Sequence, residues 1–227
     1  MTGPADKIIV ALDVSSAKAA LKLATDLYSK VRFFKIGLQL YTAPGTGIVR
    51  RVSSLSRVFL DLKLHDIPNT VAHAVESADN LGVKMLTIHL SGGAEMIQAA
   101  TTRKGKVSIF GVTVLTSANE QTLREIGIAD RIDNQVLRLA KLGVENGIDG
   151  IVASAHEIKM LRAEFGDRIK IVVPGIRPSW SEAGDQKRVM TPREAIDAGA
   201  DYLVIGRPIT THANPREAMR RILEEIS

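Results

Sequence analysis

The residues of this chain best suited to chemistry lie in one stretch, Asp61-Leu62-Lys63-Leu64-His65-Asp66-Ile67-Pro68-Asn69-Thr70. An apolar run at 58–60 leads into it, which predicts that Asp61 and Lys63 stand at the end of a strand. Side chains two apart on a strand share a face, so this carboxylate and ammonium are expected side by side. Asp66 adds a second carboxylate as the chain leaves the strand. Because such charges are costly to pack away from water, the pattern favours chemistry over a solvated ion pair on an exposed strand end.

Eight short apolar runs must position these residues, and each is followed by a segment with helical spacing of its apolar positions. The runs span residues 8–12, 33–38, 58–63, 85–89, 107–114, 150–152, 169–173 and 202–205. Alternating strands and helices give a parallel sheet through right-handed crossovers. For 227 residues, eight units predict a closed (β/α)8 barrel formed by a single domain, residues 1–227. An open doubly wound sheet is the alternative.

In such barrels the chemistry lies at the carboxyl ends of the strands. The polar residues and turn residues expected there are Asp13, Lys35, Asp61, Lys63, His89, Thr116, Pro174, Gly206 and Arg207. The first four alternate in charge, so each ammonium helps to keep a neighbouring carboxylate ionised. Such a network can present a fixed electric field to a substrate. Lys63 is then a candidate proton donor, whereas Lys35 taken alone would be interpreted as a surface lysine.

Two further segments could bind an anion at the same rim. Gly206 ends the last strand and permits close backbone approach, while Arg207 could hold a phosphate through two hydrogen bonds. A Gly-Arg pair alone would be a plain turn, but phosphate sites are common after the last strands of these barrels. The connection at about 174–190 is long enough to be a binding loop over the site rather than a simple surface excursion, and it offers Arg177 and Gln186 as donors.

The composition excludes several classes of function. The chain has no cysteine, so disulfides and cysteine nucleophiles are excluded, and a reducing, cytoplasmic location is expected. A net charge of +5 comes from dispersed residues, and no basic-aromatic segment predicts nucleic-acid binding. No apolar run is long enough for a membrane span. No histidine spacing predicts a metal site, and no glycine-rich motif predicts a dinucleotide or ATP site, so no cofactor is expected.

The decapeptide 61–70 closely resembles the signature of the orotidine 5′-monophosphate decarboxylase family, in its bacterial form. The resemblance continues, in order, through nearly the whole chain. The matching segments are Ala11-Leu12-Asp13, Phe34-Lys35-Ile36-Gly37, Val114-Leu115-Thr116-Ser117, Pro174-Gly175-Ile176-Arg177-Pro178, Gly184-Asp185-Gln186 and Val204-Ile205-Gly206-Arg207-Pro208. It implies cofactor-free decarboxylation of orotidine 5′-monophosphate to uridine 5′-monophosphate and carbon dioxide, the last step of de novo pyrimidine synthesis.

The resemblance also implies a role for each site residue. Lys63 would protonate C6 of the pyrimidine as carbon dioxide leaves, beside Asp61, and Lys35 would complete the charged array. Asp66, with Thr70, would reach the active site of a neighbouring subunit, which implies a homodimer. The remaining substrate contacts would be Asp13 and Lys35 to the ribose, Thr116 to the pyrimidine, Gln186 between base and phosphate, and Arg177, Gly206 and Arg207 to the phosphate region.

Two alternatives remain at this stage. Magnesium-dependent sugar-phosphate decarboxylases and aldolases of the same suprafamily, such as 3-keto-L-gulonate 6-phosphate decarboxylase and hexulose-phosphate synthase, share the Asp-x-Lys-x-x-Asp core. They carry a glutamate metal ligand where this chain has Lys35, and an ammonium cannot bind magnesium. The second alternative is a non-catalytic phosphate-binding barrel, which would not need Asp61, Lys63 and Lys35 together.

Overall fold

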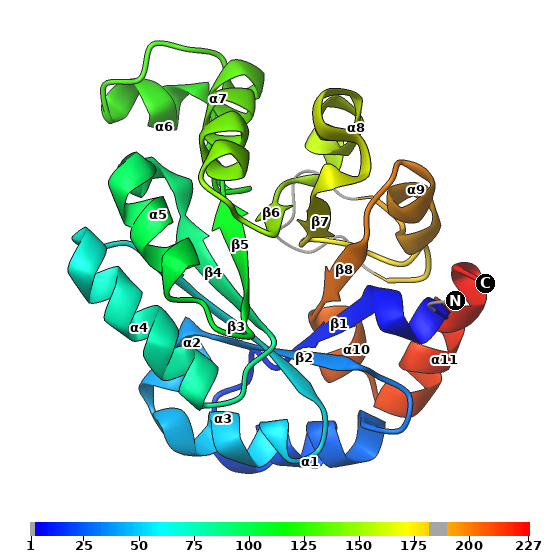
Figure 1. Cartoon of the computed structure of the whole chain (residues 1–227). Coiled ribbons are helices and arrows are strands. Elements are labelled where there is room, and N and C mark those ends of the chain that lie inside the picture. Colours follow the sequence, from blue (N-terminus) through cyan, green and yellow to red (C-terminus); the bar gives the residue numbers. More distant parts are fainter. Residues whose placement is uncertain (1–2, 182–189) are drawn as a thin grey trace.

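Eight parallel strands close into a barrel, each pairing with its neighbour in chain order, in a computed structural model that describes residues 3–181 and 190–227 (Figure 1). The strands are β1 Ile8–Ala11, β2 Phe33–Gly37, β3 Arg57–Leu64, β4 Met85–His89, β5 Ser108–Val112, β6 Gly150–Val152, β7 Lys170–Val173 and β8 Tyr202–Ile205. The first and last strands pair directly, with Ile9 opposite Val204. This pairing confirms the predicted (β/α)8 barrel and excludes the open sheet.

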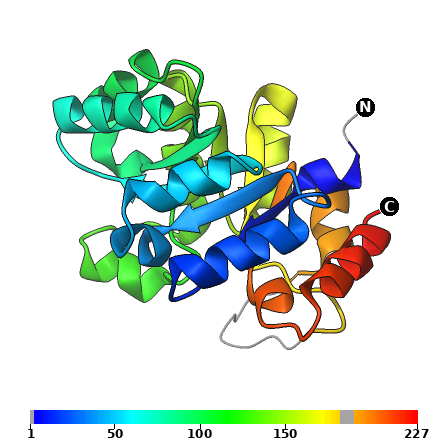
Figure 2. The same cartoon turned by 90° about the horizontal axis from the view of Figure 1, so that it is seen from below.

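The helices lie outside the strands, as Figures 1 and 2 show together. The longer ones are α1 Ala17–Leu27, α3 Thr46–Ser53, α4 Pro68–Asn80, α5 Gly93–Thr102, α7 Ile132–Glu145, α8 Ile158–Phe165 and α11 Pro215–Glu225. The shorter helices are α2 Leu38–Thr42, α6 Glu120–Glu125, α9 Pro192–Asp197 and α10 Arg207–Thr210, with 3-10 turns η1 Pro4–Lys7, η2 Leu90–Gly92, η3 Ala155–Glu157 and η4 Gly166–Arg168. None of the helices within the described residues is both long and apolar enough to cross a membrane.

The sequence specifies several helix starts locally. The Ser16 hydroxyl accepts the backbone N–H of Ala19 and caps α1. Thr191 and Glu194 form a reciprocal capping box at α9, and proline occupies the first turn of α4, α9 and α11. Helix α2 was not expected, because Leu38 extends the apolar run of β2; the strand instead ends at Gly37 and α2 begins at once.

Alternate residues of each strand pack into two separate cores. One set faces the helices and includes Ile8, Val10, Phe34 and Ile36. The other fills the barrel interior and consists of Ile9, Ala11, Phe33, Phe59, Met85, Phe110, Val172 and Val204. Strands that are covered on both sides are apolar on both sides, which is why the runs in the sequence show no polar alternation. The interior core separates the two ends of the barrel.

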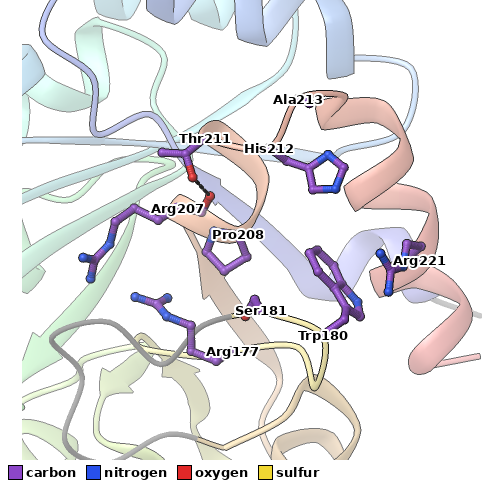
Figure 3. Close-up of a pocket in the computed structure, with 9 residues that line it drawn as sticks. All are labelled: Arg177, Trp180, Ser181, Arg207, Pro208, Thr211, His212, Ala213 and Arg221. Atoms are coloured by element: carbon purple, nitrogen blue, oxygen red, sulfur yellow. Dashed lines mark hydrogen bonds between the residues drawn. The ribbon is translucent and has the colours of Figure 1, made fainter.

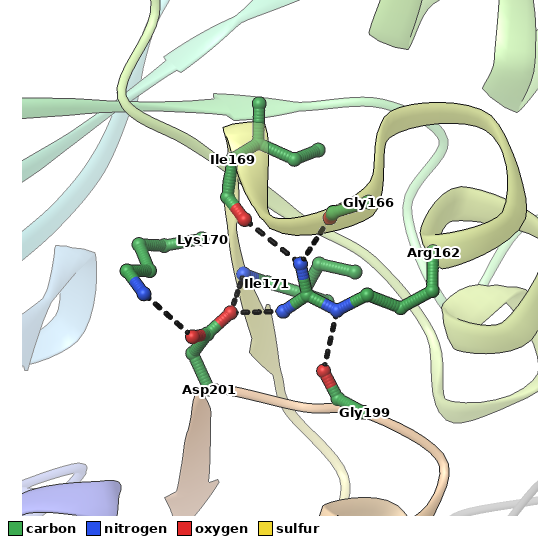
Figure 4. Close-up of polar contacts among 7 residues, drawn as sticks. All are labelled: Arg162, Gly166, Ile169, Lys170, Ile171, Gly199 and Asp201. Carbon is green, nitrogen blue, oxygen red and sulfur yellow. Dashed lines mark hydrogen bonds and ion pairs between the residues drawn. The ribbon is translucent and has the colours of Figure 1, made fainter.

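At the amino ends of the strands, Asp201 ties three elements together (Figure 4). Its carboxylate accepts the backbone N–H of Ile171 at 2.9 Å, lies 3.0 Å from the Lys170 ammonium and pairs with the Arg162 guanidinium. Arg162 also donates to the backbone carbonyls of Gly199, Gly166 and Ile169. The network therefore fixes α8 against β7 and β8, far from the rim where the sequence predicts the chemistry.

Candidate active site

Four charged side chains meet at the carboxyl ends of β1–β3 and form an alternating chain. The Lys35 ammonium lies 2.9 Å from Asp13 Oδ1 and 3.6 Å from Asp61 Oδ2. The Lys63 ammonium lies 2.8 Å from Asp61 Oδ1. The structure thus brings together the four residues that the sequence placed at this rim. We call Asp13, Lys35, Asp61 and Lys63 the charged array.

Asp61 occupies the centre of the charged array and is largely buried, with a side chain 14% exposed. Burial alone would raise the pKa of its carboxyl group. The Lys35 and Lys63 ammonium groups, with hydrogen bonds from Lys63 and Thr87, outweigh burial and hold that pKa below its usual value. Asp61 is therefore ionised at neutral pH, between two cations and beside a cavity.

Lys63 reaches Asp61 from a distorted part of β3 rather than from a regular pleat. Leu60 pairs with Leu86 and Leu64 with Ile88, so β3 uses four residue steps where β4 uses two. Within this bulge Lys63 has a φ of 51°, the only positive φ among the non-glycine residues that the structure describes. A left-handed backbone costs an ordinary residue about 1–2 kcal/mol. Backbone strain of this kind concentrates at functional sites, and β-bulges near such sites change the direction of a side chain.

Thr87, which was not among the site residues predicted from the sequence, holds the bulge in place. The Thr87 hydroxyl donates to Asp61 Oδ1 at 3.0 Å and accepts the backbone N–H of Lys63 at 2.8 Å. Its side chain is fully buried. A single polar residue within the apolar run 85–88 was the signal available in the sequence. One hydroxyl therefore orients the carboxylate and supports the strained backbone at the same time.

Gly37 leaves the space in which the charged array forms. A Cβ atom at this position would lie 2.9 Å from the Lys35 ammonium and 3.2 Å from Asp13 Oδ1. The backbone of Gly37 has no left-handed requirement, so the reason for glycine here is the close approach of Lys35 to Asp13. Any larger residue would push that ion pair apart.

A narrow cavity of about 150 Å³ opens beside the charged array. Lys35, Asp61 and Lys63 line it, together with Thr116. Its other walls are mainly apolar and come from Phe59, Val112, Val114, Leu115, Val152, Pro174 and Val204. A flat ring with a polar edge suits such a space, because its faces meet apolar side chains while its edge meets charges. We call this space the base cavity.

A second cavity, of about 580 Å³, carries the two arginines that the sequence assigned to an anion (Figure 3). Arg207 begins α10 directly after β8, where the Gly206 carbonyl accepts from Ile209 and Thr210. Arg177 follows β7 and is buried. In Figure 3 both guanidinium groups point to the same side of the cavity. Two cations converging on one space favour a phosphate-bearing ligand, and we call this space the phosphate cavity.

The opposite side of the phosphate cavity is built from Trp180 and its neighbours (Figure 3). The Arg221 guanidinium lies 4.3 Å from the centre of the indole ring. The His212 ring meets the same indole edge-on at 5.7 Å, and its Nδ1 lies 3.0 Å from the backbone nitrogen of Asn214. These contacts attach the segment after Arg177 to α11 and to the connection between α10 and α11.

Four predicted site residues within the described part of the chain line neither cavity: Asp13, which belongs to the charged array, Gly206, Asp66 and Thr70. Asp66 and Thr70 are exposed, and the Asp66 carboxylate accepts the backbone N–H of Ile67 at 2.7 Å. Ile67 itself is an apolar side chain that is 66% exposed. Gln186 lies outside the described residues, as do the other residues of 182–189 within the predicted loop.

His89 ends β4, as the sequence indicated, and its ring lies against the ring of His65. The two ring centres lie 5.6 Å apart. Burial lowers the pKa of His89, and the nearby His65 and Lys63 lower it further, against an opposing effect from Asp61. His89 is therefore neutral at pH 7, in keeping with a structural role.

No group of three potential metal ligands occurs among residues 3–181 and 190–227. Of the described residues, Asp13 and Asp61 supply the carboxylates of the charged array, and the Lys35 ammonium lies between them. A cation in that position competes directly with a divalent metal for the same oxygens. The donor set thus does not suit the magnesium-dependent alternative.

Comparison with known proteins identifies a family over nearly the whole chain. Residues 6–222 match the family described as "Orotidine 5'-phosphate decarboxylase / HUMPS family". The proteins named orotidine 5′-phosphate decarboxylase from Trichlorobacter lovleyi and Idiomarina loihiensis are 47% and 48% identical to this chain. Each comparison covers 97% of this chain, with 95% of the first relative and 97% of the second.

Solved structures agree with this assignment. The crystal structure of orotidine 5′-phosphate decarboxylase from Lactobacillus acidophilus matches with a TM-score of 0.86 and 32% identity, over 98% of this chain and 99% of that one. An uncharacterized conserved protein from Geobacillus kaustophilus matches with a TM-score of 0.85 and 33% identity, over 97% of this chain and 100% of that one. The fold and the sequence thus lead to the same family.

Proposed function

The chain belongs to the orotidine 5′-phosphate decarboxylase / HUMPS family, and from this membership and the site geometry we infer that it decarboxylates orotidine 5′-monophosphate. The reaction releases carbon dioxide and leaves uridine 5′-monophosphate, in pyrimidine biosynthesis. The observation that carries the mechanism is Asp61, which is held ionised between two ammonium groups at the edge of the base cavity.

Lys63 acts as the proton donor. The bond between C6 of the pyrimidine and its carboxylate breaks, and the electron pair stays on C6. The Lys63 ammonium then gives its proton to C6, a C–H bond replaces the lost C–C bond, and the neutral amine regains a proton from solvent. Its hydrogen bond to Asp61 at 2.8 Å holds the ammonium at the edge of the base cavity. A positioned acid of this kind typically contributes about 10²- to 10⁴-fold to a rate.

Asp61 and Lys35 supply a fixed field around the reacting carbon. The substrate carboxylate lies beside Asp61, whose charge disfavours the carboxylate and favours its loss as neutral carbon dioxide. Lys35 keeps Asp61 ionised from the other side and, with Asp13, contacts the ribose. Because these charges are already in place before the substrate binds, little reorganisation accompanies the reaction.

The remaining substrate contacts follow from the two cavities. Thr116 lines the base cavity and contacts the pyrimidine, while Arg177 and Arg207, with the backbone at Gly206, hold the phosphate. Gln186 is assigned to the region between base and phosphate on the family resemblance alone. Binding energy from the remote phosphate can be used to stabilise the transition state at C6.

We further propose a homodimer in which Asp66 and Thr70 complete the site of the partner subunit. Both side chains are exposed beside the exposed apolar side chain of Ile67, which would be covered by such a contact. Residues 1–227 form one barrel domain in this proposal. The cysteine-free composition supports a cytoplasmic location.

The activity is tested by incubating EDTA-treated protein with orotidine 5′-monophosphate and following the loss of its ultraviolet absorbance. We expect turnover without metal in the wild type and in the matched surface variant Lys159→Ala. We expect no turnover in Lys63→Ala. Lys159 is an exposed residue of α8 that lines neither cavity. No turnover by folded protein would refute the function, and turnover only with added magnesium would favour the metal-dependent alternative.

The shared site is tested by mixing two inactive variants, Lys63→Ala and Asp66→Ala. If Asp66 acts across the interface, each mixed dimer regains one intact site out of two. Random pairing makes half of the dimers mixed, so about a quarter of the wild-type activity should return. If Asp66 acts within its own subunit, a mixed dimer has no intact site and no activity returns.

A further inference from the structure

The barrel has a second charged mouth, at the amino ends of the strands and opposite the charged array. A cavity of about 300 Å³ lies there. Among the described residues, its cationic lining residues are Arg57, Lys84, Lys106 and Lys170, and Asp149 supplies a carboxylate. These five residues come from the starts of β3, β4, β5, β6 and β7, or from the one or two residues before them. We call this space the basal cavity.

Three of these cations lack a carboxylate partner within the described residues. No carboxylate oxygen there lies within 4.0 Å of the side-chain nitrogens of Arg57, Lys84 or Lys106. Arg57 pairs in register with Phe33, so both side chains face the barrel interior, and its guanidinium carbon lies 5.6 Å from the Phe33 ring centre. The Lys84 and Lys106 side chains are exposed at the rim.

The carboxylates near the basal cavity are already engaged. Asp149 binds the Lys104 ammonium at 2.7 Å and accepts the backbone N–H of Ile109. Asp201 holds Arg162, Lys170 and a backbone N–H, as Figure 4 shows. Asp79 accepts the backbone N–H groups of Lys106 and Val107. Within the described residues, none of these carboxylates lies within 4.0 Å of the side-chain nitrogens of Arg57, Lys84 or Lys106.

The basal cavity is closed off from the active site by aromatic rings. Phe110 lines the basal cavity, Phe59 lines the base cavity, and their ring centres lie 6.0 Å apart. Tyr202 packs edge-on against Phe33 at 5.8 Å in the same layer. Phe33 and Phe110 are almost fully buried, so they form a floor but offer little surface for stacking a base. Charge is therefore the feature that a ligand would meet.

We propose that the basal cavity is a second anion site, specific for a compact group with two or more negative charges of the phosphate type. Unpaired cations around a concave, partly apolar surface attract such a group strongly, because the low-dielectric wall weakens screening. The ligand is either a free inorganic anion or the phosphate end of a nucleotide. This site is independent of the proposed decarboxylation, and its test does not rely on turnover.

The test is isothermal titration with inorganic pyrophosphate at low ionic strength. It uses the Arg207→Gln background, so that binding in the phosphate cavity is weakened. We expect residual binding that falls roughly three- to tenfold on adding Lys84→Gln or Arg57→Gln, and that weakens as salt is added. Lys159→Gln, an exposed charge removed elsewhere, should leave the affinity unchanged.

Two results would overturn the proposal: no pyrophosphate binding in the Arg207→Gln protein, or binding that Lys84→Gln and Arg57→Gln leave unaffected. These variants lie at or near the surface, and thermal melting checks that each is folded. A parallel titration with uridine 5′-diphosphate separates the two sources of the ligand. If uridine 5′-diphosphate and pyrophosphate bind with equal affinity, phosphate groups alone are recognised. If uridine 5′-diphosphate binds more tightly, and Lys84→Gln and Arg57→Gln weaken that binding, the nucleoside contributes.

Discussion

Two aspartates in this barrel each lie between two cations, yet they do different work. Asp61 lies between Lys35 and Lys63 at the carboxyl ends of the strands. Asp201 lies between Arg162 and Lys170 at the amino ends. Their side chains are similarly shielded, with 14% and 22% exposed. Burial and charge therefore do not separate them.

What separates the two is how the partners are used. Around Asp201, the guanidinium of Arg162 also binds three backbone carbonyls, so the network joins elements of the fold. Around Asp61, the ammonium groups contact only carboxylates in the described structure, a cavity adjoins them, and Lys63 has a strained backbone. A charge cluster that fastens backbone stabilises the fold, whereas one that faces a cavity under strain is built for chemistry.

The largest expected effect concerns Lys63. Both Lys63→Ala and Lys63→Gly should lower kcat/KM by about 10⁴-fold, because the proton donor is gone. In an ordinary strand, glycine is less stable than alanine. Here Lys63→Gly should instead be more stable than Lys63→Ala by about 1 kcal/mol, since glycine accepts a positive φ without strain. Steady-state kinetics and urea denaturation measure the two effects. Equal stability would show that the bulge at Lys63 carries no strain.

The comparison itself is tested by the matched pair Asp61→Asn and Asp201→Asn. Asp61→Asn should lower kcat by about 10³-fold, because the fixed negative charge beside the substrate is lost. It should lower the free energy of unfolding by less than Asp201→Asn does, because Lys35 still pairs with Asp13 and the Lys63 side chain reaches solvent. Asp201→Asn should leave kcat within a few fold but lower the free energy of unfolding by about 3 kcal/mol, because Arg162 and Lys170 lose their shared partner. If both variants lost activity and stability alike, the distinction would fail.

A smaller effect is expected at Thr87. Thr87→Val keeps the shape but removes the hydroxyl, which leaves the Lys63 N–H without its acceptor and Asp61 without a donor. Stability should fall by about 1–3 kcal/mol and kcat by about ten- to a hundredfold, as the array loses its alignment. Thr87→Ser retains the hydroxyl and should restore most of both. If Thr87→Ser lost as much stability and activity as Thr87→Val, the effect would come from packing rather than from the hydroxyl.

The smallest effect is the pH dependence that Asp61 confers. Burial raises its pKa, but Lys35, Lys63 and Thr87 bring it below the ordinary value of 3.8. A depressed carboxyl pKa contributes stability that is fully present above the unfolded value and is lost as pH falls through the folded value. The stability difference between wild type and Asp61→Asn should thus be constant from pH 7 to about 4 and shrink only below that. Urea titrations at several pH values measure it, and a change between pH 5 and 7 would contradict the depressed pKa.

Much of the fold could be predicted because its signals are local. Apolar runs, the Ser16 and Thr191 caps and the proline starts each act within a few residues, and the structure places strands at all eight predicted runs. Helix α2 was missed because Leu38 fits a strand and a helix equally well by composition. In the structure β2 ends at Gly37 and Leu38 begins α2.

The site was predictable in its residues but not in its geometry. The sequence placed Asp61 and Lys63 together by regular alternation, whereas they meet through a bulge that depends on the register of β4. The polar residue Thr87 stands out within its apolar run, but its role could not be predicted, because its contacts are 24 and 26 residues away along the chain. Interactions between strands decide these features, and no local pattern records them.

Trp180 gives the phosphate cavity an unusual optical property. It is the only tryptophan of the chain, and its indole lies in the same cavity as Arg177 and Arg207, against the Arg221 guanidinium and the His212 ring. Light absorbed at the red edge of the protein spectrum is therefore absorbed at one place. The tryptophan fluorescence of this protein is a local signal from the phosphate cavity, with no averaging over other sites and no need for an attached dye.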